Sequence, residues 1–259
     1  MSFLSYLISG ISLGSIYAII ALGYTMVYGI ARMLNFAHGD IIMVGGFAIF
    51  TMVSTLGMAP MVGILTAIVV CTVLGVTIEF VAYRPLRGAS SLAVLITAIG
   101  VSYLLQNLAL LIFGSNARQF TSVVTVPGLK LAGGRLSISG ETIVTIVVCI
   151  VIMGGLTGFI NKTKVGQAML AVSEDRGAAT LMGINVNRTI AITFAIGSAL
   201  AAIAGALLCS TYPSLTPYTG SMPGIKAFVA AVFGGIGSLP GALIGGIILG
   251  VVENLSKPY

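Results

Sequence analysis

The chain has few charged residues, a single histidine, no tryptophan and only three cysteines. Charged residues make up 7% of its 259 residues, whereas soluble domains carry about 25%. So few charges cannot cover the outside of a soluble domain of this length, which excludes that class. Hydrophobic residues make up 58% of the chain and the mean hydropathy is +1.13, so the composition indicates a polytopic membrane protein.

The scarcity of reactive side chains also excludes most catalytic sites. His38 has no second metal ligand at helical spacing, and no glycine-rich loop is followed by Lys-Ser or Lys-Thr, the pattern that cradles nucleotide phosphates. We therefore expect no catalytic residue, no metal site and no cofactor in this chain. No series of Asp, Glu and His crosses the apolar spans, which disfavours a proton-driven carrier.

The sequence also lacks the features of a cleaved signal peptide and of a cysteine metal site. No basic residue precedes Arg32, and the first apolar run is too long for a cleaved signal peptide, so we expect it to be a retained helix. Cys71, Cys149 and Cys209 lie inside apolar runs without metal-ligand spacing, and we expect buried free thiols there.

Seven apolar segments suit membrane-spanning helices, because about 20 residues cross the ~30 Å hydrocarbon core. They run over 4–30, 41–56, 61–82, 91–113, 141–160, 189–210 and 225–252. The last is interrupted by GGIGSLPG (234–241), where Pro240 cannot continue an ordinary helix, so two half-length helices are predicted. Broken helices commonly line permeation paths, but a simple packing hairpin explains the break equally well. The predicted fold is an all-α transmembrane helix bundle forming one domain over residues 1–259.

Glycines four residues apart are typical of close contacts between membrane helices. The chain has three such pairs, Gly10 with Gly14, Gly241 with Gly245, and Gly246 with Gly250. They predict a compact bundle and point to no particular function.

Basic residues predict the orientation, because cytoplasmic loops carry an excess of Lys and Arg. The short loop 83–88 and the segment 161–188 are both basic, and placing both inside puts 31–40 inside and the N-terminus outside. The loop 114–140 is then outside, although it carries three basic residues. The net charge of +6 mostly reflects this bias. It does not indicate nucleic acid, because no basic groove with interleaved aromatics is present.

Gln106 and Asn107 fall near the middle of the fourth span, where an unpaired amide is costly. They line a substrate path or bond to a neighbouring helix, and the second interpretation is the commoner one. With so few other polar groups in the spans, we expect a path with few polar contacts and no fixed counter-charge.

A polar island interrupts the apolar pattern. The segment from Lys162 to Arg188 holds six of the chain's eighteen charged residues. Ser173 is predicted to cap a short helix that Gly183 closes in a left-handed conformation. The nine residues between them span about 13 Å, too short to cross a membrane. We expect Leu181 and Met182 to face the bundle and the charges of 174–176 to face the cytoplasm.

This segment resembles the cytoplasmic coupling segment of ABC-importer permeases, whose pattern is Glu-Ala-Ala, three residues, then Gly. Ala178, Ala179 and Gly183 match that spacing, and Gly177 stands where Glu is usual. The residues that the resemblance assigns to ATPase coupling are Ser173, Glu174, Asp175, Arg176, Gly177, Ala178, Ala179 and Gly183.

Three longer stretches are similar to the permeases for branched-chain amino acids. They are residues 10–47, which contain MLNFAHGD, and residues 95–114 and 233–255. The resemblance is to the H-type subunit more than to its longer M-type partner, and Asn35 and His38 join Gln106 and Asn107 as candidate path residues. The family usually continues with a further helix where this chain stops at Tyr259, so we expect that helix to be missing.

The resemblance implies a permease subunit of an ATP-driven importer for leucine, isoleucine and valine in the bacterial plasma membrane. Its implied partners are a homologous second permease, two cytoplasmic ATPase subunits that use ATP and Mg, and an external solute-binding protein. Membrane lipid surrounds the assembly. Related branches move urea, short amides or sugars, and a secondary carrier is a more distant alternative.

Overall fold

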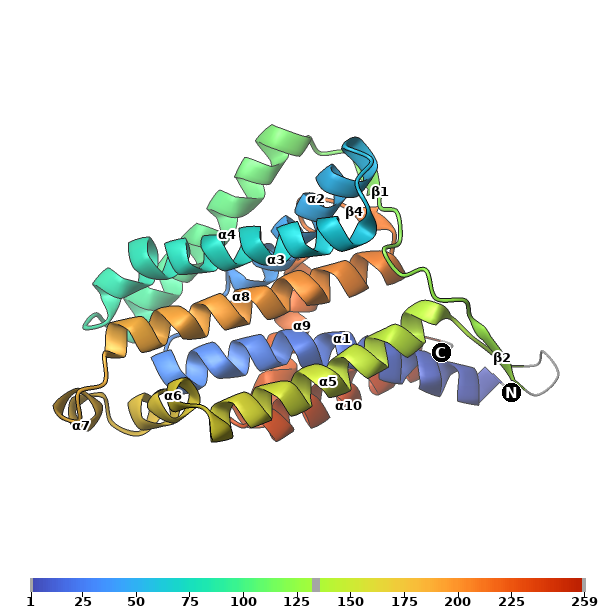
Figure 1. Cartoon of the computed structure of the whole chain (residues 1–259). Helices are drawn as coiled ribbons and strands as arrows, with labels where there is room; N and C mark the ends of the chain where they lie inside the picture. Colours follow the sequence, from blue (N-terminus) through green and yellow to red (C-terminus); the bar gives the residue numbers. More distant parts are fainter. Residues whose placement is uncertain (1, 132–135, 258–259) are drawn as a thin grey trace.

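The computed structural model describes residues 2–131 and 136–257. Helices dominate the chain, and a few two- or three-residue strands pair in its loops (Figure 1). The helices are α1 Ser2–Ala31, α2 His38–Phe50, η1 Thr51–Thr55, α3 Pro60–Ile78, η2 Glu79–Tyr83, η3 Arg84–Leu86, α4 Ser91–Phe113, α5 Gly140–Lys162, α6 Lys164–Glu174, α7 Arg176–Leu181, α8 Val186–Thr211, α9 Ser221–Phe233 and α10 Leu239–Ser256. The strands are β1 Arg118–Gln119, β2 Leu129–Leu131, β3 Leu136–Ile138 and β4 Ser214–Leu215.

Seven helices of the described ranges are long and apolar enough to cross a membrane, which confirms the all-α polytopic prediction. The interruption of the last apolar segment is also confirmed, because α9 ends at Phe233 and α10 begins at Leu239. The two pieces are unequal. α10 is 18 residues long and counts as a span, whereas α9 has only 13 residues.

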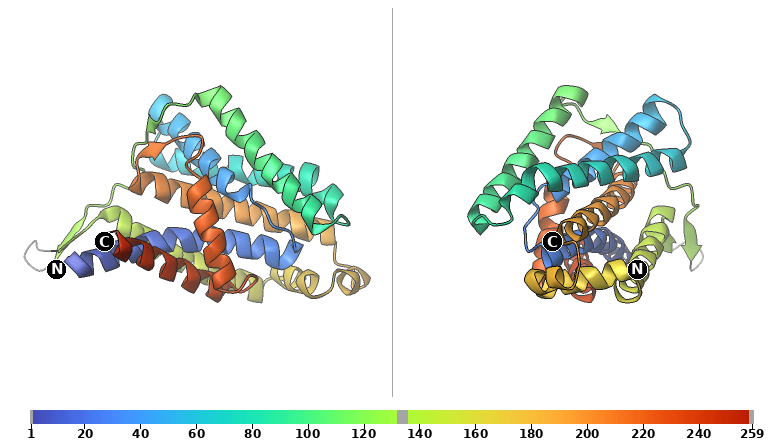
Figure 2. Two further views of the ribbon diagram at one scale, coloured as in Figure 1. Left: turned by 180° about the vertical axis from the view of Figure 1, so that it is seen from behind. Right: turned by 60° about the vertical axis from the view of Figure 1, so that its left-hand side comes forward.

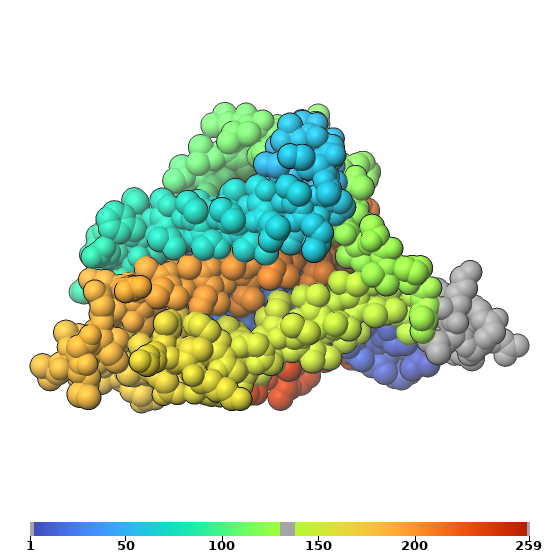
Figure 3. Space-filling model, in the orientation of Figure 1, coloured from blue at the N-terminus to red at the C-terminus, as the bar shows by residue number. Residues whose placement is uncertain are grey.

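The long helices α1, α5, α8 and α10 run roughly alongside one another, while α9 crosses them at a steep angle and α4 slants away from the bundle (Figure 2). α8 is the most buried span, followed equally by α1 and by the span that α2 and η1 form, and α4 and α5 have the smallest buried share. The three cysteines are buried and free, as predicted. In the space-filling view, α3, α5 and α8 form much of one outer face (Figure 3).

The contact between α1 and α10 depends on glycine. A Cβ atom built on Gly250 would lie 2.2 Å from the backbone N of Gly14, and one on Gly246 would lie 2.6 Å from the Cα of Ala18. The predicted close approach at Gly10, Gly14, Gly246 and Gly250 is therefore confirmed: in lipid, absent side chains let two backbones pack closely.

The segment after α1 turns back into the bundle. α2 begins at His38, whose ring packs against Gly23. Gly23 precedes the end of α1 by eight residues, which is about 12 Å along a helix. The prediction that residues 31–40 form a surface loop is therefore wrong for 37–40, because the buried Ala37 and the residues after it lie inside the bundle.

The predicted cytoplasmic segments do share one end of the molecule. Arg32 donates to the Ser173 carbonyl at 2.9 Å, Arg176 donates to the Ala31 carbonyl, and Arg87 donates to the Asn187 side chain. The paired strands β1 and β4 and the N-terminus lie at the opposite end (Figure 1). The assignment of the arginine-rich end to the cytoplasm remains a prediction from its basic residues.

We expect Gly250→Ala to destabilise the protein by about 1–3 kcal/mol, because the new methyl group would overlap the backbone of α1. The measurement is thermal unfolding of the purified protein in detergent. The matched control is Gly154→Ala in α5, where an added Cβ meets nothing within 4 Å. Equal melting temperatures for the two variants would show that the α1–α10 contact does not need glycine.

Candidate functional site

The first residues of α2 and α9 meet inside the bundle. A Cβ on Gly220 would lie 1.8 Å from the Gly39 carbonyl oxygen, and one on Gly224 would lie 2.9 Å from the Gly39 Cα. Only glycine permits so close an approach at these positions. The first turns of α2 and α9, which carry the positive ends of the two helix dipoles, therefore lie close to each other.

A buried carboxylate lies at this meeting point. Asp40, the third residue of α2, is 2% exposed. Its Oδ1 accepts a hydrogen bond from Gln106 Nε2 at 2.9 Å, and the same nitrogen lies 3.2 Å from Ser102 Oγ and 3.3 Å from Ser221 Oγ. Side chains from α2, α4 and α9 thus form one polar cluster within the bundle.

The cluster borders a cavity of about 300 Å³, which we call the Asp40 chamber. Its wall combines the polar cluster with aromatic and aliphatic side chains, so it suits a ligand with a charged group and an apolar part. The lining residues are Tyr24, Phe36, Gly39, Asp40, Ile99, Ser102, Tyr103, Gln106, Ser221, Gly224 and Ile225.

Of the four predicted path residues, only Gln106 lines this chamber. Asn107 is exposed on α4 and donates to the Tyr103 carbonyl of its own helix at 2.7 Å. Asn35 is buried and accepts from the Tyr83 hydroxyl at 3.0 Å. His38 is 1% exposed, its ring lies edge-on to Tyr24, and its Nε2 has no partner among the described residues.

The expectation of a path without a fixed counter-charge stays a prediction, because the structure does not trace the path; the chamber itself has the Asp40 carboxyl group in its wall. Sequence reasoning missed Asp40 because it grouped the residue with the cytoplasmic loop. One signal was present: Asp40 directly precedes the apolar run that begins at Ile41, and an acidic residue is stabilised in the first turn of a helix.

The polar island folds as two helices instead of one. Thr163 caps α6, which continues to Glu174, so Ser173 lies in the last turn of α6 and is not the predicted cap. Asp175 caps α7, and its Oδ1 accepts from the backbone N–H of Gly177 at 2.7 Å and of Ala178 at 3.0 Å. Aspartate and serine are comparable caps, so sequence preference alone did not separate them.

The two faces of α7 differ from the prediction. Leu181 and Met182 are 90% and 82% exposed, and Ala179 is the buried residue of this helix. Gly183 follows with φ +81°, which confirms the predicted left-handed position. The short helix therefore presents an apolar tip away from the bundle. Large exposed apolar side chains of this kind mark a candidate contact surface.

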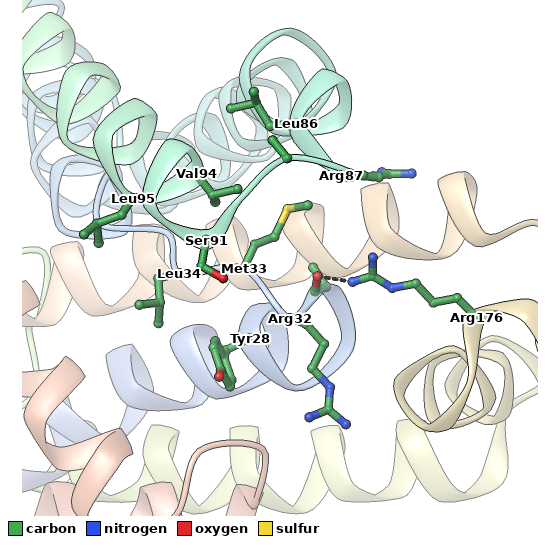
Figure 4. Close-up of a pocket in the computed structure, with 12 residues that line it drawn as sticks. Tyr28, Arg32, Met33, Leu34, Leu86, Arg87, Ser91, Val94, Leu95 and Arg176 are labelled. Atoms are coloured by element: carbon green, nitrogen blue, oxygen red, sulfur yellow. Dashed lines mark hydrogen bonds between the residues drawn. The ribbon is translucent and has the colours of Figure 1, made fainter.

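Arg176 connects α7 to the core. Its guanidinium donates to the carbonyl of Ala31, the last residue of α1, instead of facing solvent freely as predicted (Figure 4). Arg32, which directly follows α1, donates to the Ser173 carbonyl in the last turn of α6. Two reciprocal side-chain to backbone contacts thus link α6 and α7 to the point where the chain turns back toward Asp40.

The chain is similar to known permeases over almost its whole length. The chain matches the family described as branched-chain amino acid transport system, permease component, over residues 6–259. It is 45% identical to the high-affinity branched-chain amino acid transport system permease protein LivH of Escherichia coli K12, over 99% of this chain and 87% of that protein. It is 44% identical to the permease BraD of Pseudomonas aeruginosa, over 97% of this chain and 85% of that protein.

More distant relatives match less of the chain. The fructose import permease FrcC of Rhizobium meliloti is 31% identical over 46% of this chain, covering 33% of that protein. No solved structure matches the chain.

We expect Gln106→Leu to destabilise the protein by about 1–3 kcal/mol, because the buried Asp40 carboxylate would lose a hydrogen-bond donor. Asn107→Leu is the matched control, since its amide bonds only to its own helix. Thermal unfolding in detergent measures both variants. If the control lost as much stability as Gln106→Leu, the Asp40–Gln106 contact would not be the cause.

Proposed function

We propose that this chain forms part of a path for leucine, isoleucine and valine, and that separate ATPase subunits drive the transport. The reason is that the chain belongs to the family of branched-chain amino acid transport permeases. The chain is the permease component of such a system. The observation that carries the substrate assignment is the buried Asp40 carboxylate in a largely apolar chamber.

An amino acid with an aliphatic side chain matches both parts of that chamber. Its ammonium group would pair with Asp40, and its side chain would face Phe36, Ile99 and Ile225. A carboxylate in a low-dielectric site attracts a cation far more strongly than it does in water. Sugars, urea and amides carry no such cation, so the chamber favours amino acids over the solutes of related branches.

The assembly that we propose contains a homologous second permease, two cytoplasmic ATPase subunits and an external solute-binding protein, in the bacterial inner membrane. The peripheral α4, with exposed Leu111 and Ile112, has a surface that a second permease or lipid would cover. This chain would be non-catalytic and without cofactor, and ATP and Mg would be used by the ATPase subunits.

The ATPase contact that we propose is the tip of α7. Leu181 and Met182 would enter a groove of the ATPase. The other residues from Ser173 to Gly183 would form the rest of the contact. Movement of α7 would pass through Arg176 to the end of α1, and from there along 32–37 to the start of α2. Force applied at the coupling segment would therefore reach the Asp40 chamber.

We expect the reconstituted complex to take up labelled leucine, with competition by isoleucine and valine but not by urea. Asp40→Asn is expected to lower uptake about tenfold or more, because it retains the shape of the side chain but removes its charge, and one lost ion pair of ~1.4 kcal/mol is a factor of ten. Glu141→Gln, which removes a carboxylate outside the chamber, is the control. Undiminished uptake by Asp40→Asn would rule out the ammonium site.

We expect the double variant Leu181→Ser, Met182→Ser to lose the ATPase subunits on purification, because its apolar contact with them is removed. Leu56→Ser with Met58→Ser, exposed apolar residues in the connection between η1 and α3, serves as the control. Co-purification measured by quantitative gel analysis reports the result. Full retention of the ATPase by the first variant would place the contact elsewhere.

A further inference from the structure

A second cavity, of about 440 Å³, lies at the arginine-rich end, where the first and third spans end and the fourth begins (Figure 4). We call it the arginine pocket. It is lined by Tyr28, Ala31, Arg32, Met33, Leu34, Leu86, Arg87, Ala89, Ser91, Val94, Leu95 and Arg176. None of these residues is acidic, and three of them are arginines that come from different elements.

Positive charge in this pocket exceeds negative charge. Arg87 pairs with Glu79, but Arg32 and Arg176 donate only to uncharged backbone carbonyls among the described residues. Burial lowers the pKa of Arg176, and the nearby charges of Arg87 and Arg32 lower it further. Like charges gathered at a partly enclosed site repel one another, so an anion bound among them would be stabilised.

Arg32 adopts a backbone conformation that favours glycine. Its φ is +53°, and its N–H bonds to the Tyr28 carbonyl at 2.8 Å, so it closes α1 in the left-handed position. Glycine would make this turn without strain, whereas arginine makes it at a cost in free energy. The contacts of the arginine side chain at the edge of the pocket, among them its hydrogen bond to the Ser173 carbonyl, therefore offset this strain.

The arginine pocket and the Asp40 chamber share three lining elements. Both are lined by α1, α4 and the segment between α1 and α2, with Tyr28 and Tyr24 one turn apart on α1. On α4, Leu95 lines the pocket and Ser102 lines the chamber, a separation of about 10 Å along the helix. Along α1 and α4 there is thus a carboxyl group deep in the bundle and a set of guanidinium groups nearer the arginine-rich end.

We propose that the arginine pocket binds the carboxylate of the transported amino acid at the cytoplasmic mouth of the path, after its ammonium group has left Asp40. This inference rests on the proposed function. The apolar wall formed by Met33, Leu86 and Val94 would receive the aliphatic side chain. Because Arg176 belongs to α7, movement of the coupling helix would shift one of the guanidinium groups and so weaken or restore the site.

Charge-selective labelling of a cysteine in the pocket tests its electrostatics. Ser91→Cys places a thiol at an exposed position of the lining, and the three native cysteines are buried. In the assembled complex at low ionic strength, we expect an anionic methanethiosulfonate to react at least about tenfold faster than a cationic one, relative to free thiol, because a cleft of one charge concentrates counter-ions by 10–10³-fold.

Arginine variants in the same background identify the groups responsible. Arg176→Gln and Arg32→Gly are each expected to remove most of this charge preference, and Arg32→Gly does so while keeping the left-handed turn. Arg84→Gln is the matched control, because it removes the same charge at the same end but lines a different cavity. An anionic preference that survives both pocket variants, or that disappears equally in the control, overturns the proposal.

Protection of the thiol of the Ser91→Cys variant by added compounds identifies the occupant. In nanodiscs of phosphatidylcholine alone, leucine and 4-methylpentanoate are expected to slow labelling several-fold, while isopentylamine, which lacks a carboxylate, is not. Protection by isopentylamine equal to that by leucine overturns the proposal. So does protection by inorganic phosphate or by added phosphatidylglycerol without protection by leucine, because the oxyanion would then be a free phosphate or a lipid headgroup.

The labelling does not depend on transport, so its failure is distinguishable from failure of the proposed function. Leucine uptake without charge-selective labelling rejects the pocket and retains the importer. Carboxylate protection without leucine uptake rejects the transport assignment.

Discussion

The arrangement of this protein depends on the contact between Gly39 and Gly220, where the first residues of α2 and α9 approach within the bundle. A side chain at either position would overlap the other backbone. The contact aligns the positive ends of two short helices on one region and brings Ser221 to Gln106. The donor to Asp40 comes from α4, where Gln106 Nε2 bonds both to Asp40 and to Ser221.

Burial of that carboxylate is the clearest sign of function in the molecule. An ionised group in a low-dielectric environment is costly unless it is paired or hydrogen-bonded. Asp40 has a hydrogen-bond donor in Gln106 and the favourable field of its own helix N-terminus, but it forms no ion pair with any residue that the structure describes. In the proposed function, this buried carboxyl group is where the cationic group of the ligand binds.

The opposite charges lie in the arginine pocket, where Arg32 bonds to Ser173 and Arg176 belongs to α7. Arg176 reaches from α7 to the last carbonyl of α1, and Arg32 reaches from the end of α1 to the last turn of α6. The six residues after Ala31 then lead directly into α2 and Asp40. In the proposed coupling, a displacement of α7 would act through this short stretch of chain on the start of α2.

The seven apolar spans, the broken last segment and the glycine contacts between helices followed from the sequence, because bilayer thickness and close backbone packing constrain length and residue type directly. The left-handed turn at Gly183, which ends the polar segment, also followed. The sequence did not reveal that residues 32–37 turn back into the bundle, that Asp40 meets Gln106, or that Leu181 and Met182 face outward. Local patterns show which residues are polar, but only the packing of α2, α4 and α9 decides which polar groups meet, since those partners are 66 and 115 residues apart in sequence.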